Sequence, residues 1–305
     1  MKQIYLNNSL VFLFSIISVL SCSTVKIKGE LEVKNVRSKI ETFISSKQGD
    51  YAIAYKDIQN GNTIFINEHD MFHAASTMKT PVMIELFKQS EQLKFNVNDS
   101  VVVHNSFKSI VDGSEFSTDK EEDSDKEIYS LIGSKMTINE LIHRMITVSS
   151  NLATNILIEL VDAKNITQTM RELGAKKIQV LRGVEDILAF RAGLNNSTTA
   201  YDLLVIFEHL AGKDFLTRQS HDNIINILLD QKLNDKILAK LPQGIRAANK
   251  TGSITNVEHD SGIVFLPDGR QYILIMLSKN LDSNKSGIDV LAEISKMIYE
   301  EIYLN

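Results

Sequence analysis

The chain of 305 residues contains a single cysteine, so no intramolecular disulfide can form. Its seven histidines are scattered, and no third side chain at metal-ligand spacing accompanies the one close pair, His69 and His73. The formal net charge is −5, and no basic stretch is interleaved with aromatic residues. We therefore expect no metal, no cofactor and no nucleic-acid partner.

Long apolar runs are also scarce. The most prominent run, residues 10–20, follows Lys2 and is too short to cross a bilayer as a helix. This arrangement is typical of a secretion signal, which we assign to residues 1–21. The residues just before Cys22, Val19-Leu-Ser, are close to a bacterial lipobox. We expect an exported protein, periplasmic or anchored to a membrane through a lipid on Cys22; the alternative is ordinary signal removal beside an incidental cysteine.

Strand patterns occur near both ends of the mature chain, which begins with a short tether at residues 22–30. Alternating apolar residues and turn signals such as Asn60-Gly61 predict five strands. They cover residues 51–58, 63–66, 247–255, 262–266 and 271–278.

Helical periodicity dominates the middle of the chain. The expected helices cover residues 33–44, 76–89, 151–161, 166–173, 200–210, 220–229 and 287–303, with a further helix after the capping box formed by Thr137 and Glu140. The acid-rich residues 112–127 are expected to form a solvated loop.

This order of elements predicts an α+β fold. One antiparallel sheet is built from both chain ends, residues 31–75 and 230–305, and is flanked by the terminal helices. Residues 76–229 form an inserted all-helical lobe.

Three short polar motifs carry the chemistry, and the first is Ser76-Thr-Met-Lys79. If Ser76 opens a helix, both side chains lie on one helix face. Lys79 can accept the serine proton only when it is neutral, and burial or a second cation lowers a lysine pKa. The same spacing occurs at Ser23 and Ser117, but neither begins an apolar helix.

The second motif, Ser149-Ser-Asn151, lies between two predicted helices. The Ser149 hydroxyl can pass a proton to a leaving nitrogen, and the Asn151 amide can hold a substrate carbonyl. The alternative is a corner that only caps and joins two helices.

The third motif, Lys250-Thr-Gly-Ser253, lies on a predicted strand. Gly252 permits close approach of another backbone, and Lys250 supplies a second cation. Thr251 and Ser253 are candidates for binding a carboxylate, and the backbone N–H of Ser253 would form an oxyanion hole with that of Ser76.

In this order, the three motifs resemble those of the class A serine β-lactamases and related penicillin-recognising enzymes. The likeness covers nearly the whole mature chain and includes Met145–Asn155, Leu241–Gly244 and Thr198–Asp202. The resemblance implies that a β-lactam acylates Ser76, that Lys79 is a base or proton relay, that Ser149 protonates the ring nitrogen, and that Lys250 acts electrostatically.

The resemblance also implies an Ω-loop at about residues 181–198. Glu185 is the candidate base that activates water for release of the acyl group, with Asp186 as its competitor, and Arg182 is expected to anchor the loop. Four residues after Glu185 the family usually has an asparagine that shares this water, whereas this chain has Ala189.

Three smaller departures concern the other motifs. Ser150 stands where aspartate is common, and Ile254 follows Ser253 in place of glycine. Ser261 stands where many members carry an arginine for the substrate carboxylate. Substrate anchoring is therefore expected to rest on Lys250, Thr251 and Ser253.

The expected function is that of a monomeric serine β-lactamase that confers β-lactam resistance. Two alternatives stay open. One is a D,D-peptidase-like penicillin-binding protein that releases its acyl group slowly. The other is a non-catalytic lipoprotein that binds peptidoglycan or antibiotic.

Overall fold

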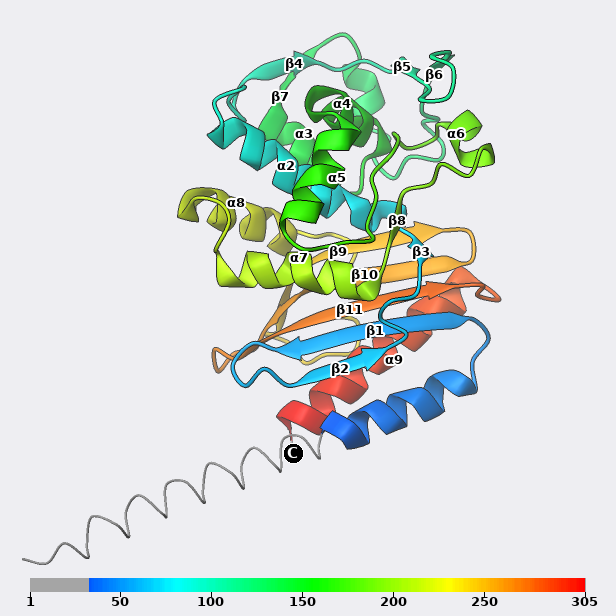
Figure 1. Cartoon of the computed structure of the whole chain (residues 1–305), viewed down its shortest axis with the longest axis vertical. Helices are drawn as coiled ribbons and strands as arrows, with labels where there is room; N and C mark the ends of the chain where they lie inside the picture. Colours follow the sequence, from blue (N-terminus) through cyan, green and yellow to red (C-terminus); the bar gives the residue numbers. More distant parts are fainter. Residues whose placement is uncertain (1–32, 305) are drawn as a thin grey trace, which may run out of the picture.

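The computed structural model describes residues 33–304. The expected signal peptide, tether and Cys22 lie outside this part of the chain. The described residues form an antiparallel sheet with two helices on one face and a helical lobe on the other (Figure 1). The expected α+β fold, with a sheet from both chain ends and an inserted helical lobe, is confirmed.

The central sheet has the strand order β2-β1-β11-β10-β9, and all of its neighbours are antiparallel. Its strands are β1 (Asp50–Asp57), β2 (Thr63–Ile66), β9 (Arg246–Ile254), β10 (Val257–Phe265) and β11 (Gln271–Lys279). Because β9 is the last strand of this sheet, its outer backbone edge is available beside the helical lobe.

Apolar residues on both faces of the sheet explain why its strands are so hydrophobic. On β1, Ala52 and Ala54 belong to the core shared with the helical lobe. Ile53 points the opposite way, into a second core with the helix at residues 33–45 and with α9 (Asn284–Tyr303). With both faces buried, the sheet is a firm support for the site at its edge.

The helical lobe lies above the sheet, with α7 lying over the sheet's upper face (Figure 1). Its helices are η1 (Ala75–Met78), α2 (Lys79–Glu91), η2 (Ile128–Leu131), α3 (Ile138–Thr147), α4 (Asn151–Val161), α5 (Ala163–Glu172), α6 (Ile187–Arg191), α7 (Ala200–Gly212) and α8 (Arg218–Leu229). Short strand pairs join β3 (Phe72–His73) to β8 (Ser197–Thr198), β4 (Ser100–Val102) to β7 (Lys135–Thr137), and β5 (Phe107–Lys108) to β6 (Glu115–Phe116). Among residues 33–304, no helix has the length and hydropathy needed to cross a membrane.

Side-chain caps begin the helices where the sequence predicts. Thr137 and Glu140 form the reciprocal capping box of α3, and the Ser150 hydroxyl accepts from the backbone N–H of Ala153 at the start of α4. The cap on α4 fixes where the second polar motif ends and its helix begins.

Two predictions about element boundaries were wrong. Ser76 lies in the 3₁₀ turn η1, and the α-helix starts only at Lys79. The strand predicted from Gly262 starts at Val257, because the polar side chains of residues 258–261 hide its strand character although all four are buried. The helix α6 inside the expected Ω-loop was not predicted.

Most of residues 112–127 are exposed, as expected for a solvated loop, but two of the acids are buried. Asp123 and Asp125 are only 2% and 5% exposed. Asp125 accepts two hydrogen bonds from Arg144 at 2.9 and 3.0 Å, which offsets the cost of burying its charge. These two acids, unlike the rest of the segment, are therefore packed into the protein beside α3 and α4.

Candidate active site

Ser76 lies in a turn that packs against the edge strand β9. The residue before it, Ala75, has a left-handed backbone with φ of 45°. A Cβ atom on Gly252 would lie 3.2 Å from both the Ala75 Cβ and the Ser76 nitrogen. Glycine at this position therefore lets the strand approach the backbone of the candidate nucleophile, as the third motif predicts.

Lys79 is fully buried and binds the second motif. Its Nζ donates to the Ser149 carbonyl at 2.7 Å, to the Ser149 Oγ at 3.1 Å and to the Asn151 Oδ1 at 3.0 Å. Burial lowers the pKa of Lys79 to about 7, although the charges of Asp123 and Glu185 oppose the shift. The three donated hydrogen bonds are those of a protonated amine, and the lowered pKa lets Lys79 lose and regain a proton near neutral pH.

Lys250 approaches the same hydroxyl from the strand. Its Nζ donates to the Ser149 Oγ at 3.1 Å and to the Thr251 carbonyl at 3.0 Å. Burial, and then the nearby charge of Lys79, hold the pKa of Lys250 well below its usual value. The Ser149 hydroxyl thus lies between two buried amines, an arrangement that can relay a proton.

Glu185 is directed toward this cluster from the loop before α6. Its Oε2 accepts from the Asp119 backbone N–H at 2.6 Å, and its Oε1 accepts from the Asn151 Nδ2 at 3.2 Å. Burial raises the pKa of Glu185 despite these two hydrogen bonds. Its backbone, like that of Ser149, is left-handed, with φ of 68°.

Asp186, the other candidate acid, is fully engaged elsewhere. It is 1% exposed and accepts from the Ser109 hydroxyl and from the backbone N–H groups of Ile110 and Ala189. These bonds cap α6 and join it to residues 109–110. Of the two acids, only Glu185 contacts the candidate site.

Ala189 is completely buried, and its N–H is already bonded to Asp186. A methyl group there offers nothing to hold a water molecule. At the position where the family pattern has a water-binding asparagine, the structure therefore has a buried methyl group.

The loop that carries Glu185 is anchored by two side chains. Arg182 donates from its Nε to the Leu194 carbonyl at 3.1 Å, which bears out its predicted role. Asn155 exchanges two hydrogen bonds with the Val184 backbone, at 2.6 and 2.9 Å. Asn155 was not predicted as a site residue, although it follows Asn151 by one helical turn and so lies on the same face of α4.

Asp123 is a second site residue that was not predicted from the sequence. Its Oδ2 accepts from the backbone N–H groups of Asn151 and Leu152, both at 2.9 Å. A carboxylate at a helix N-terminus is favoured by the helix dipole and by the free N–H groups. Asp123 thus adds a carboxylate at the N-terminus of α4, beside the Ser150 hydroxyl that caps this helix.

Ser261 does not face the site as a replacement for the family's arginine. Its hydroxyl donates to the Lys250 carbonyl at 3.1 Å and is completely buried within the sheet. No cluster of histidine, cysteine or acidic side chains among residues 33–304 has the geometry of a metal site.

Comparison with known proteins agrees with this arrangement. A family model described as the β-lactamase enzyme family matches residues 35–302. The chain belongs to the β-lactamase enzyme family. It is 22% identical to a β-lactamase of Bacteroides uniformis over 302 residues, covering 95% of this chain and 98% of that protein. The predicted resemblance to class A enzymes is therefore confirmed.

Solved structures share the fold of this β-lactamase family member. The structure of PBP-A superposes with a TM-score of 0.75 at 23% identity, covering 89% of this chain and 97% of the other. The TLA-1 extended-spectrum β-lactamase gives a TM-score of 0.76 at 19% identity, covering 88% and 99%.

Proposed function

We propose that this protein is a serine β-lactamase that opens the lactam amide through an acyl-enzyme on Ser76. Membership of the β-lactamase family supports a hydrolase that acts on β-lactams. The observation that carries the mechanism is the position of the Ser149 hydroxyl, 3.1 Å from both Lys79 and Lys250.

In the acylation step, the Ser76 Oγ attacks the lactam carbonyl as its proton moves to a base. Neutral Lys79 is the candidate base, with Glu185 acting through a water molecule as the alternative. Ser149 gives a proton to the ring nitrogen as the carbon–nitrogen bond breaks, and one of the two lysines re-protonates Ser149.

The negative charge on the carbonyl oxygen needs donors that are already in place. We assign this role to the backbone N–H groups of Ser76 and Ser253, since Gly252 brings the two segments together. One such donor contributes about 10²–10³-fold to the rate in related chemistry.

In the release step, Glu185 takes a proton from water as the water attacks the acyl carbonyl. Its contact with Asn151 directs it toward the acylating cluster. Its raised pKa makes it a stronger base than an exposed glutamate.

A direct test mixes the purified mature protein with a chromogenic cephalosporin and records both hydrolysis and intact mass. Sustained hydrolysis with a transient adduct is expected. The absence of both hydrolysis and adduct would contradict the proposal and favour a non-catalytic binding protein.

One observation favours a second candidate, a penicillin-binding protein with slow release. Ala189 gives the attacking water one polar partner fewer than the family pattern provides. A variant of the structural neighbour PBP-A is described as an acyl-enzyme complex with penicillin G, so this fold is compatible with a lasting adduct. A long-lived adduct on the unmodified protein would support this candidate, and Ala189→Asn should then speed its release.

We also propose export and lipid anchoring at Cys22, with a monomer as the working unit and β-lactam resistance as the biological result. A Cys22→Ala variant expressed in bacteria should move from the membrane fraction to the soluble fraction. Unchanged fractionation would contradict the anchor, and unchanged drug sensitivity of cells expressing the protein would contradict the resistance role.

A further inference from the structure

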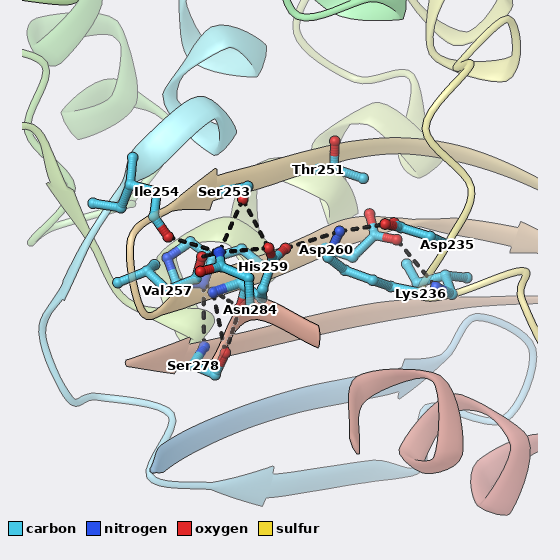
Figure 2. A network of polar contacts seen from close by, with 12 residues as sticks. Asp235, Lys236, Thr251, Ser253, Ile254, Val257, His259, Asp260, Ser278 and Asn284 are labelled. Carbon is cyan, nitrogen blue, oxygen red and sulfur yellow. Dashed lines mark hydrogen bonds and ion pairs between the residues drawn. The ribbon is translucent and has the colours of Figure 1, made fainter. Parts of the chain in front are cut away.

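At the exposed end of β9, Ser253 already donates its hydroxyl proton in a hydrogen bond within the protein. Ser253 lies directly opposite Glu258 across the β9–β10 hairpin, and its Oγ donates to the Glu258 Oε1 at 2.7 Å. Asn284 donates from its Nδ2 to the same carboxylate oxygen at 2.8 Å and to the Ser253 Oγ at 3.2 Å (Figure 2). A hydroxyl has only one proton, so Ser253 can offer its surroundings only a lone pair.

Glu258 is buried beside a lysine. It is 2% exposed, and its other oxygen, Oε2, lies 3.0 Å from the Nζ of Lys236, whose side chain is 3% exposed. Lys236 also pairs with Asp235 at 2.8 Å, as Figure 2 shows. Burial alone would lower the pKa of Lys236, but Asp260 and Glu258 raise it, so Lys236 stays protonated. A hydrogen bond from a hydroxyl to such a carboxylate is strong and directional.

Ser253 follows directly after the strand residue that packs against the turn of the candidate nucleophile. Thr251 and Ser253 share one face of β9 because they are two residues apart, and Gly252 between them contacts the Ser76 turn. Within residues 33–304, the Thr251 hydroxyl makes no hydrogen bond, so its proton is free for a ligand. Neighbouring hydroxyls on one face of the strand therefore have opposite roles, Thr251 as donor and Ser253 as acceptor.

We propose that Glu258, acting through Ser253, determines substrate specificity at this end of the site. The Ser253 oxygen disfavours a carboxylate next to the scissile amide and favours an uncharged group or a hydrogen-bond donor there. Of two cyclic amides that differ only at that position, Ser253 therefore weakens the binding of the one with the anionic group. This inference rests on the proposed function and reverses the carboxylate-binding role that the sequence predicts for Ser253.

The test compares a chromogenic cephalosporin that has a free ring carboxylate with its methyl ester. The measured quantity is the ratio of the KM for the acid to the KM for the ester. Ser253→Ala removes the acceptor oxygen and leaves the Glu258–Lys236 pair intact, so the ratio should fall about 3- to 10-fold, the factor that one ordinary hydrogen bond is worth. If Ser253 instead donates to the carboxylate, the ratio rises; a rise or no change overturns the inference.

Glu258→Gln gives a second, independent reading. The amide removes the charge that orients the Ser253 hydroxyl, so the ratio should again fall. The double variant with Ser253→Ala should show no further fall, because Glu258 acts only through Ser253. A thermal unfolding curve checks that the buried Lys236 tolerates the loss of its partner.

Glu293→Gln is the matched control, since Glu293 pairs with Lys240 at 2.7 Å on the surface of α9, outside the site. It should leave the ratio unchanged. If the unmodified protein is acylated by neither compound, the proposed function fails and this inference fails with it. If both compounds react and the ratio behaves otherwise than stated, only the inference fails.

Discussion

The acylating cluster and the loop that carries Glu185 are built in different ways. Lys79, Ser149 and Lys250 come from a helix start, a helix junction and a sheet strand, and all three are buried. Glu185 lies in a loop with a left-handed backbone, held by Asn151 and Asp119. Helices and a strand thus position the acylating groups, whereas a few hydrogen bonds position Glu185, the base for release of the acyl group.

The largest expected effect comes from the scaffold side of this comparison. Ser76→Ala removes the nucleophile, so β-lactam turnover should fall by about 10⁴-fold or more. Steady-state hydrolysis of a chromogenic cephalosporin measures it, with a thermal melt to show that the fold persists. Substantial residual hydrolysis would mean that another group attacks the lactam.

The loop side should respond differently. Glu185→Gln removes the base for release but not the acylating cluster, so steady-state turnover should fall by roughly 10²–10⁴-fold while a rapid burst of one equivalent remains. Asp186→Asn is the matched control, because Asp186 only caps α6 and holds Ser109 and Ile110. It should cost about 1–3 kcal/mol of stability and give no trapped adduct. A burst in Asp186→Asn alone would reverse the assignment.

The pH dependence of the burst separates the two regions further. In Glu185→Gln only acylation is observed, and neutral Lys79 is the reactive form. The pKa of Lys79 is about 7 in the unmodified protein, and Glu185→Gln removes one of the two charges that raise it, so the burst rate should rise about tenfold per pH unit at low pH and level off below pH 7. A rate that is flat across this range would exclude Lys79 as the base.

A smaller effect should come from Asp123, whose charge acts on both Lys79 and Glu185. In the Glu185→Gln background, Asp123→Asn removes the second of the two charges that raise the Lys79 pKa, so the midpoint of the burst-rate profile should move to still lower pH. Stability should fall by about 1–2 kcal/mol as the cap on α4 weakens. Asp125→Asn, which loses the Arg144 pair, should destabilise without moving the midpoint; equal midpoint shifts in both variants would contradict the specific role of Asp123.

Much of the scaffold and the acylating cluster could be predicted from sequence, since local patterns encode them. Caps such as Thr137 and Ser150 begin helices whatever the tertiary context. The Ser76 and Lys250 motifs are short, and their elements are strongly apolar. Because their order along the chain matches that of a known enzyme family, the sequence predicted that the motifs meet in one site.

The rest depends on partners far away in the sequence. Asp123 lies in a polar stretch typical of a solvated loop, and only the packing against α4 gives it a role. The start of β10 was not predicted because its buried polar residues have partners far away in the sequence. The Glu258 carboxylate pairs with Lys236, and the Glu258 backbone N–H donates to the Ser278 hydroxyl. The direction of the Ser253 proton follows from hairpin register, which no local pattern specifies.

The most direct test of the central claim is the intact and peptide mass of Glu185→Gln after a brief exposure to a penicillin. We expect a persistent adduct of one equivalent, located on the peptide that contains Ser76, while the unmodified protein returns to its original mass. An adduct elsewhere, or hydrolysis by the unmodified protein with no adduct on Ser76 in Glu185→Gln, would contradict it.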